Sequence, residues 1–185
     1  DLVYHSATKF LSGHGTVIGG LVVDGGSFDW DRSGKFAELT QAYDGFHNMV
    51  FSEESTVGAF LLRARREGLR DFGACMSPHT AWLILQGIET LPLRMARHMS
   101  NTEKVVGFLA AHPFVSRVGH PLLESHTSHA LAQKLLPRGA GSVFSFDLKG
   151  SREQGKAFVE SLKVFSHLAN VGDCRSLVIH PASTT

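Results

Sequence analysis

The sequence is short of cysteine, carries almost no net charge and lacks a long uncharged apolar run. Its two cysteines, Cys75 and Cys174, lie far apart, which predicts neither a metal site nor a disulfide framework and indicates a reducing, cytoplasmic compartment. Lys and Arg number 18 and Asp and Glu number 17, and a net charge of +1 argues against a nucleic-acid partner. Glycine and polar residues interrupt the apolar stretches, so we expect no membrane span.

The composition is that of a folded protein with a packed core. Hydrophobic residues make up 43% of the 185 positions and charged residues 19%. Glycine and other small residues crowd the first 30 positions around a short strand at 20–24, which ends in a Gly25–Gly26 turn. Residues 31–58 are polar and irregular, and this pattern predicts a long loop with short turns.

Two helices are expected in the middle of the chain. Ser77 is typical of an N-cap, with Pro78 at the first helical position. Thr90 is expected to cap a second, longer helix that runs to Ala110 and ends before Pro113.

After residue 113 the sequence alternates between strand and helix patterns. The expected elements are strands at 114–118, 142–148 and 176–179 and helices at 126–136 and from 151. The order β-α-β-α-β predicts a small α/β layer. We therefore place a domain boundary near His112, which gives domains 1–112 and 113–185.

Lys9 lies in the segment with the clearest chemical potential. It follows a strand end, with Ser6 three positions and Thr8 one position before it, and a glycine-rich loop comes next. An amine can form a Schiff base with an aldehyde, and hydroxyl and backbone N–H groups can hold a phosphate. The spacing alone also fits an ordinary surface lysine beside a turn, whereas a Walker A loop would need its glycines before the lysine.

The stretch from His5 to Gly20 resembles the lysine segment of the Cys/Met-metabolism family of pyridoxal-phosphate enzymes, nearest to its O-acetylhomoserine sulfhydrylase branch. Further stretches resemble that branch in the same order, at 29–30, 69–73, 76–78, 85–94 and 171–185. The resemblance implies an α/β fold of the aspartate-aminotransferase type, fold type I. Residues 1–112 would then be the C-terminal part of the large cofactor domain with its connecting helix, and 113–185 a truncated small C-terminal α/β domain.

The resemblance also assigns roles to single residues. Lys9 matches the lysine that binds pyridoxal 5'-phosphate as a Schiff base and acts in catalysis. Ser6 and Thr8 match the hydroxyls that bind the cofactor phosphate. Ser176 matches the serine near the lysine and the substrate carboxylate, although a strand-start residue bonded to local backbone is an equal alternative. The family's partner for the pyridine nitrogen lies upstream of this sequence and its carboxylate-binding arginine downstream, so we expect a piece of a longer protein.

The implied activity is pyridoxal-phosphate-dependent γ-replacement on O-acetyl-L-homoserine with sulfide, which gives L-homocysteine and acetate in methionine biosynthesis. Cystathionine γ-synthase, a γ-lyase or an O-succinylhomoserine sulfhydrylase of the same family are alternatives. A different alternative is a structural or oligomerisation fragment, because the isolated chain is expected to be inactive. The partners expected are small-molecule substrates and further copies in a homotetramer built from dimers that share active sites.

Arginines are expected to have structural rather than catalytic roles. Arg94 and Arg97 are interpreted as salt-bridge partners between helices or subunits. A basic run that is typical of a solvated helix face contains Arg63, Arg65, Arg66 and Arg70.

Overall fold

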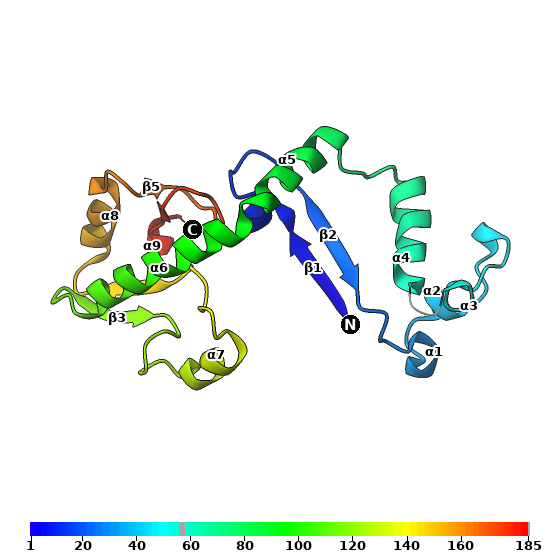
Figure 1. Cartoon of the computed structure of the whole chain (residues 1–185), viewed down its shortest axis with the longest axis horizontal. Helices are drawn as coiled ribbons and strands as arrows, with labels where there is room; N and C mark the ends of the chain where they lie inside the picture. The colour runs from blue at the N-terminus through cyan, green and yellow to red at the C-terminus, as the bar shows by residue number, and fades with distance from the viewer. Residues whose placement is uncertain (56–57, 185) are drawn as a thin grey trace. The chain divides into compact units, whose positions relative to one another are not determined.

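The computed structural model describes residues 1–55 and 58–184. Residues 56 and 57 of the expected 31–58 loop, and Thr185, lie outside the described part. The chain divides into two compact units, coloured from blue to red along the sequence in Figure 1. Unit 1 comprises Asp1–Thr8 and Val17–Ile84, and unit 2 comprises Lys9–Thr16 and Leu85–Thr185.

Unit 1 begins with two antiparallel strands, β1 (Leu2–Ser6) and β2 (Gly20–Asp24), and the strand predicted at 20–24 is confirmed (Figure 1). Every residue of β1 pairs with one of β2, from Leu2 opposite Asp24 to Ser6 opposite Gly20. Apolar side chains of both strands are exposed, and Tyr4 reaches 80% exposure. The two strands therefore present an uncovered apolar surface within this chain.

The expected loop at 31–58 is instead a series of short helices around an aromatic core. They are α1 (Trp30–Ser33), α2 (Ala37–Thr40), a 3-10 turn (Asp44–Phe46) and α3 (Phe51–Glu54). Asp29 caps α1, since its side chain accepts from the Arg32 N–H at 2.9 Å. The buried core consists of Trp30, Leu39, Phe46, Phe51 and Ala59. The loop prediction was wrong because these aromatic residues are irregularly spaced and only their packing reveals the core.

Two longer helical runs follow. Helix α4 (Ala59–Arg63) continues as a π-helical segment, Ala64–Asp71. Helix α5 (Pro78–Glu89) starts where the sequence predicts, because the Ser77 hydroxyl accepts from the Thr80 N–H at 3.1 Å.

Helix α6 (Leu91–Ala110) is the longest helix among the described residues, and its predicted end at Ala110 is confirmed. Thr90 occupies the N-cap position, as predicted, but its hydroxyl makes no cap hydrogen bond and instead donates to the Gly87 carbonyl at 3.3 Å. Thr102 and Val106 form the buried face of the helix.

Unit 2 then adds short strands and helices. In order, they are β3 (Val115–Gly119), α7 (His129–Leu135), β4 (Ser145–Leu148), α8 (Arg152–Ser161), β5 (Ser166–His167), β6 (Leu177–Val178) and α9 (Pro181–Thr184). Strands β3 and β4 pair antiparallel, and β5 and β6 pair parallel. Ser151 and Gln154 form a capping box at the start of α8. The predicted strands and helices are present, but the strands form two separate pairs in the described residues.

The two compact units are defined by contacts inside this chain, and they place α6 with the C-terminal elements. They do not test the domains of the protein, so the proposed boundary near residue 112 stays a prediction. Across residues 1–55 and 58–184, no helix has both the length and the apolar character needed to cross a membrane.

Candidate active site

Lys9 lies in a short π-helical turn, Ala7–Leu11, that interrupts the path from β1 to the glycine loop. The backbone leaves helical geometry at Lys9 itself, with φ −92° and ψ −118°. Its side chain is half-buried, and its Nζ donates a hydrogen bond to Asn170 Oδ1 at 2.6 Å. The amine is thus held by an uncharged amide, which orients it without forming an ion pair.

The loop that carries Asn170 packs directly on the backbone of the lysine turn. Gly172 has φ +75°, and a Cβ there would overlap the main chain of Lys9 and Phe10. Asp173 is buried, and its Oδ1 accepts from the Arg175 N–H at 2.9 Å. This hydrogen bond lowers the pKa of Asp173, so the carboxylate stays charged and stabilises the loop.

Arg94, on the first turn of α6, contacts the same turn through its guanidinium group. Its terminal nitrogens donate to the carbonyls of Phe10 at 2.9 Å, Leu11 at 3.3 Å and Gly87 at 2.6 Å. Its Nε donates to the Thr90 hydroxyl at 3.1 Å. Within the described chain Arg94 therefore binds main-chain carbonyls rather than the carboxylate that the sequence suggested.

His98 lies one helical turn beyond Arg94 and contacts Phe10 edge to face, with ring centroids 5.9 Å apart. Its Nε2 is buried without a hydrogen-bond partner among the described residues. Burial, and then the charge of Arg94, lower the pKa of His98. A neutral imidazole thus packs beside the residue that follows Lys9.

Ser6 and Thr8 belong to unit 1. Ser6 is half-buried at the end of β1. The Thr8 hydroxyl donates to the Gly19 carbonyl at 3.2 Å and accepts from the Gly19 N–H at 3.0 Å. Thr8 therefore fastens the end of β1 to the start of β2, and the phosphate-binding role of both hydroxyls stays a prediction.

Ser176 is exposed at the start of β6, where its carbonyl accepts from the Ser166 N–H at 2.9 Å. Its expected position near the substrate stays a prediction. Sequence reasoning missed Asn170, the residue that the fold does bring to the Lys9 amine. The available signal was an asparagine just before a Gly-Asp turn, immediately upstream of the family-like stretch at 171–185.

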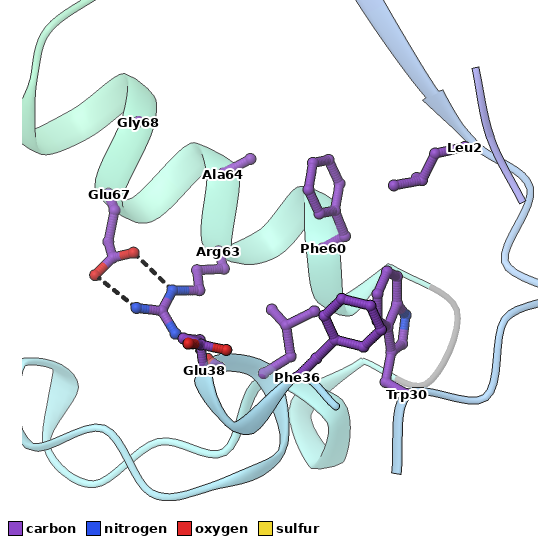
Figure 2. Close-up of a pocket in the computed structure, with 10 residues that line it drawn as sticks. Leu2, Trp30, Phe36, Glu38, Phe60, Arg63, Ala64, Glu67 and Gly68 are labelled. Atoms are coloured by element: carbon purple, nitrogen blue, oxygen red, sulfur yellow. Dashed lines mark hydrogen bonds and ion pairs between the residues drawn. The ribbon is translucent and has the colours of Figure 1, made fainter. Parts of the chain in front are cut away.

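Unit 1 holds an apolar groove of about 410 Å³. Within the described part of the chain, its lining contains no Lys, Cys, Ser or Thr side chain that could act as a nucleophile. The aromatic rings of Trp30, Phe36 and Phe60 gather along it (Figure 2). The ionic side chains in the lining are Glu38, Arg63 and Glu67. Its chemistry is therefore apolar packing beside one ion pair.

That ion pair joins Arg63 and Glu67 across one helical turn, with Arg63 Nε 2.6 Å from Glu67 Oε2 (Figure 2). The hydrogen bond from Arg63 lowers the pKa of Glu67, and the Glu67 carboxylate raises the pKa of Tyr43. Arg63 also lies 4.9 Å from the centroid of the Tyr43 ring. The expectation of a solvated face is wrong for Arg63 and correct for the exposed Arg65, Arg66 and Arg70.

Comparison with known proteins places the chain in a family. The family model described as Cys/Met metabolism PLP-dependent enzyme matches residues 1–185. An O-acetyl-L-homoserine sulfhydrylase of Leptospira meyeri is 49% identical over all of this chain and 44% of its own length. A homocysteine synthase of Schizosaccharomyces pombe is 48% identical, over all of this chain and 43% of its own length. The chain thus spans less than half the length of these curated relatives.

Solved structures agree with the sequence relatives. A solved structure from Campylobacter jejuni, described as a putative O-acetylhomoserine (thiol)-lyase and carrying an N'-pyridoxyl-lysine-5'-monophosphate, matches with a TM-score of 0.92 and 35% identity, over 100% of this chain and 44% of that one. A cystathionine gamma synthase from Xanthomonas oryzae pv. oryzae matches with a TM-score of 0.73 and 31% identity, over 100% and 39%. The α/β fold expected from the sequence is therefore confirmed. The chain belongs to the Cys/Met metabolism family of PLP-dependent enzymes.

Proposed function

We propose that the full-length protein replaces the acetoxy group of O-acetyl-L-homoserine by sulfide and forms L-homocysteine and acetate, with pyridoxal phosphate bound at Lys9. The observation that carries this proposal is the half-buried Lys9 amine, 2.6 Å from Asn170, in a turn held by Arg94. Relatives at 43–49% identity that are named for this reaction or its product support the substrate class.

The residues around Lys9 fit a phosphorylated aldehyde. A primary amine held by a neutral amide can bond to a carbonyl carbon, and Ser6 and Thr8 precede it by three and one positions. The Thr8 hydroxyl can donate to a phosphate if its O–H rotates away from the Gly19 carbonyl, to which it now donates. When bound, the cofactor supplies an electron acceptor for charge that develops at the substrate α-carbon.

Lys9 has two tasks in this proposal. Its amine would hold the cofactor, and it would also accept the proton from the substrate α-carbon and shuttle a proton at the β-carbon. Asn170 Oδ1 gives this amine a hydrogen-bond acceptor at 2.6 Å. Because the acceptor is uncharged, it does not hold the amine as half of an ion pair.

The test is carried out on the full-length protein. Borohydride reduction followed by peptide mass analysis should find a pyridoxyl group on Lys9, and Lys9→Ala should remove both this label and turnover. Near-normal turnover of Lys9→Ala would contradict the proposal. Assays of sulfide against cysteine, and of the acetyl against the succinyl ester, separate the sulfhydrylase from cystathionine γ-synthase, a γ-lyase and an O-succinylhomoserine sulfhydrylase.

We further propose that the isolated 185-residue chain is inactive, and that the full-length protein is a cytoplasmic homotetramer of dimers with shared sites. The exposed apolar side chains of β1 and β2, among them Val3 at 56% and Tyr4 at 80% exposure, support a need for further packing partners. Titration of the isolated chain with pyridoxal phosphate, and mass determination of the full-length protein in solution, test these two points.

A further inference from the structure

Arg94 makes an unusually complete set of contacts for a half-buried arginine on the first turn of a helix. Four hydrogen bonds leave its guanidinium group, three to carbonyls and one to the Thr90 hydroxyl. Two of these carbonyls belong to Phe10 and Leu11, the residues that directly follow Lys9. The third belongs to Gly87, in the last turn of α5. One side chain thus ties the lysine turn to the junction of α5 and α6.

The glycines around Arg94 show that the fit is close. A Cβ at Gly13 would overlap the Arg94 guanidinium group. A Cβ at Gly87 would overlap the carbonyls of Leu11 and Ser12. The turn after Lys9 therefore packs closely against α5 and α6, with no space for a side chain at Gly13 or Gly87. The Arg94 guanidinium group lies directly beside Gly13.

Loss of the guanidinium donors would be costly at the half-buried carbonyls of Phe10 and Leu11, because packing limits the water that could replace them. The Gly87 carbonyl would still accept from the Thr90 hydroxyl. A guanidinium group can donate to several carbonyls at once from separate nitrogens in one plane, whereas a lysine ammonium has all three of its donors on one nitrogen atom. Arg94 donates to main-chain carbonyls of Phe10 and Leu11, so these hydrogen bonds fix the backbone of the turn rather than the rotamer of a side chain.

We propose that Arg94 is a positioning residue, which fixes the main chain after Lys9 and thereby directs the Lys9 amine toward the bound cofactor. This inference rests on the proposed function of Lys9. Asn170 holds the tip of the lysine side chain, and Arg94 holds the backbone from which the side chain extends. The two contacts come from segments far apart in the sequence, so each can be removed without the other.

The experiment compares Arg94→Gln and Arg94→Lys with Arg97→Gln in the full-length protein. Arg97 is exposed on the same helix, three positions further on, and is the matched control. Hydrogen exchange of the Gly13 amide, which donates to the Lys9 carbonyl at 2.8 Å, reports the order of the turn. The dissociation constant for pyridoxal phosphate and the pH midpoint of the visible band of the bound cofactor report the direction of the amine.

For Arg94→Gln we expect exchange of Gly13 and the cofactor dissociation constant both to rise by about tenfold or more, as loss of a charged hydrogen-bond donor predicts, together with a shifted pH midpoint. Arg94→Lys should give intermediate values, and Arg97→Gln should match the parent. A lower melting temperature with unchanged exchange, affinity and midpoint would mean a merely structural role and overturn the inference.

Two further outcomes are decisive. If Arg94→Gln does not fold, Arg94→Lys decides: intermediate values support the inference, and values equal to the parent overturn it. If the parent itself shows no borohydride-trapped cofactor on Lys9, the proposed function fails and the inference falls with it. A parent that traps cofactor on Lys9, with unaltered Arg94 variants, refutes the positioning role alone.

Discussion

Replacement of Gly172 by alanine tests whether close packing of the 170–175 loop on the lysine turn is needed. Gly172 has φ +75°, and an L-residue there costs about 1–2 kcal/mol. The new Cβ would also overlap the main chain of Lys9 and Phe10, which cannot rotate away, and overpacking of this kind adds about 1–3 kcal/mol. Gly141→Ala is the matched control, because Gly141 has φ +87° and no heavy atom within 4 Å of the added Cβ.

We therefore expect Gly172→Ala to lower the free energy of unfolding by about 2 kcal/mol more than Gly141→Ala does. Unfolding of the cofactor-free full-length protein in urea, followed by circular dichroism, measures the difference. Gly172→Ala should also weaken binding of pyridoxal phosphate, since relief of the overlap must displace the backbone at Lys9. Equal destabilisation by the two variants, with equal cofactor affinity, would refute the packing that the structure shows.

Two further predictions concern the neighbours of Lys9. Asn170→Ala should lower kcat by about tenfold, because it removes a hydrogen bond to a charged group. Asn170→Asp should move the pH optimum upward, because a carboxylate retains the proton on Lys9. An unchanged kcat and pH–rate profile in both variants would contradict the role of Asn170. His98 has a folded-state pKa below its ordinary 6.5, so the stability linked to it is present above pH 6.5 and lost as the pH falls through the folded-state value. His98→Leu should remove this part of the acid sensitivity, which melting temperatures at pH 5 and pH 8 can measure; an identical pH dependence in the variant would rule the linkage out.

The site consists of an amine held by Asn170, on a turn whose main chain is held by Arg94. Asn170 lies 161 positions from Lys9 in the sequence, and Arg94 lies 84 positions from Phe10. Each contact is polar and neither partner is a carboxylate, so within residues 1–55 and 58–184 the hydrogen bonds from Lys9 to Asn170 and from Arg94 to the lysine turn are made to uncharged acceptors. This arrangement suits a group that has to bond to a carbonyl carbon and also transfer protons.

Features that depend on neighbouring residues could be predicted from the order of the amino acids. Strand β2, the long helix α6 and the start of α5 at Ser77–Pro78 follow from periodicity and capping chemistry, which act within a few positions. The lysine segment identified the family in the same way, through a continuous stretch of residues around Lys9.

Contacts between groups far apart in the sequence are seen only in the folded molecule. The helices between Trp30 and Glu54 form because irregularly spaced aromatic residues share one core, and no periodic pattern announces such a core. The Thr90 hydroxyl makes no cap hydrogen bond at the start of α6 because it bonds to the Gly87 carbonyl and to Arg94 Nε instead. Asn170 and Arg94 reach the lysine turn because Gly172, Gly87 and Gly13 lack side chains at the points of contact. Such contacts depend on packing between segments far apart in the chain, and local sequence does not specify which segments meet.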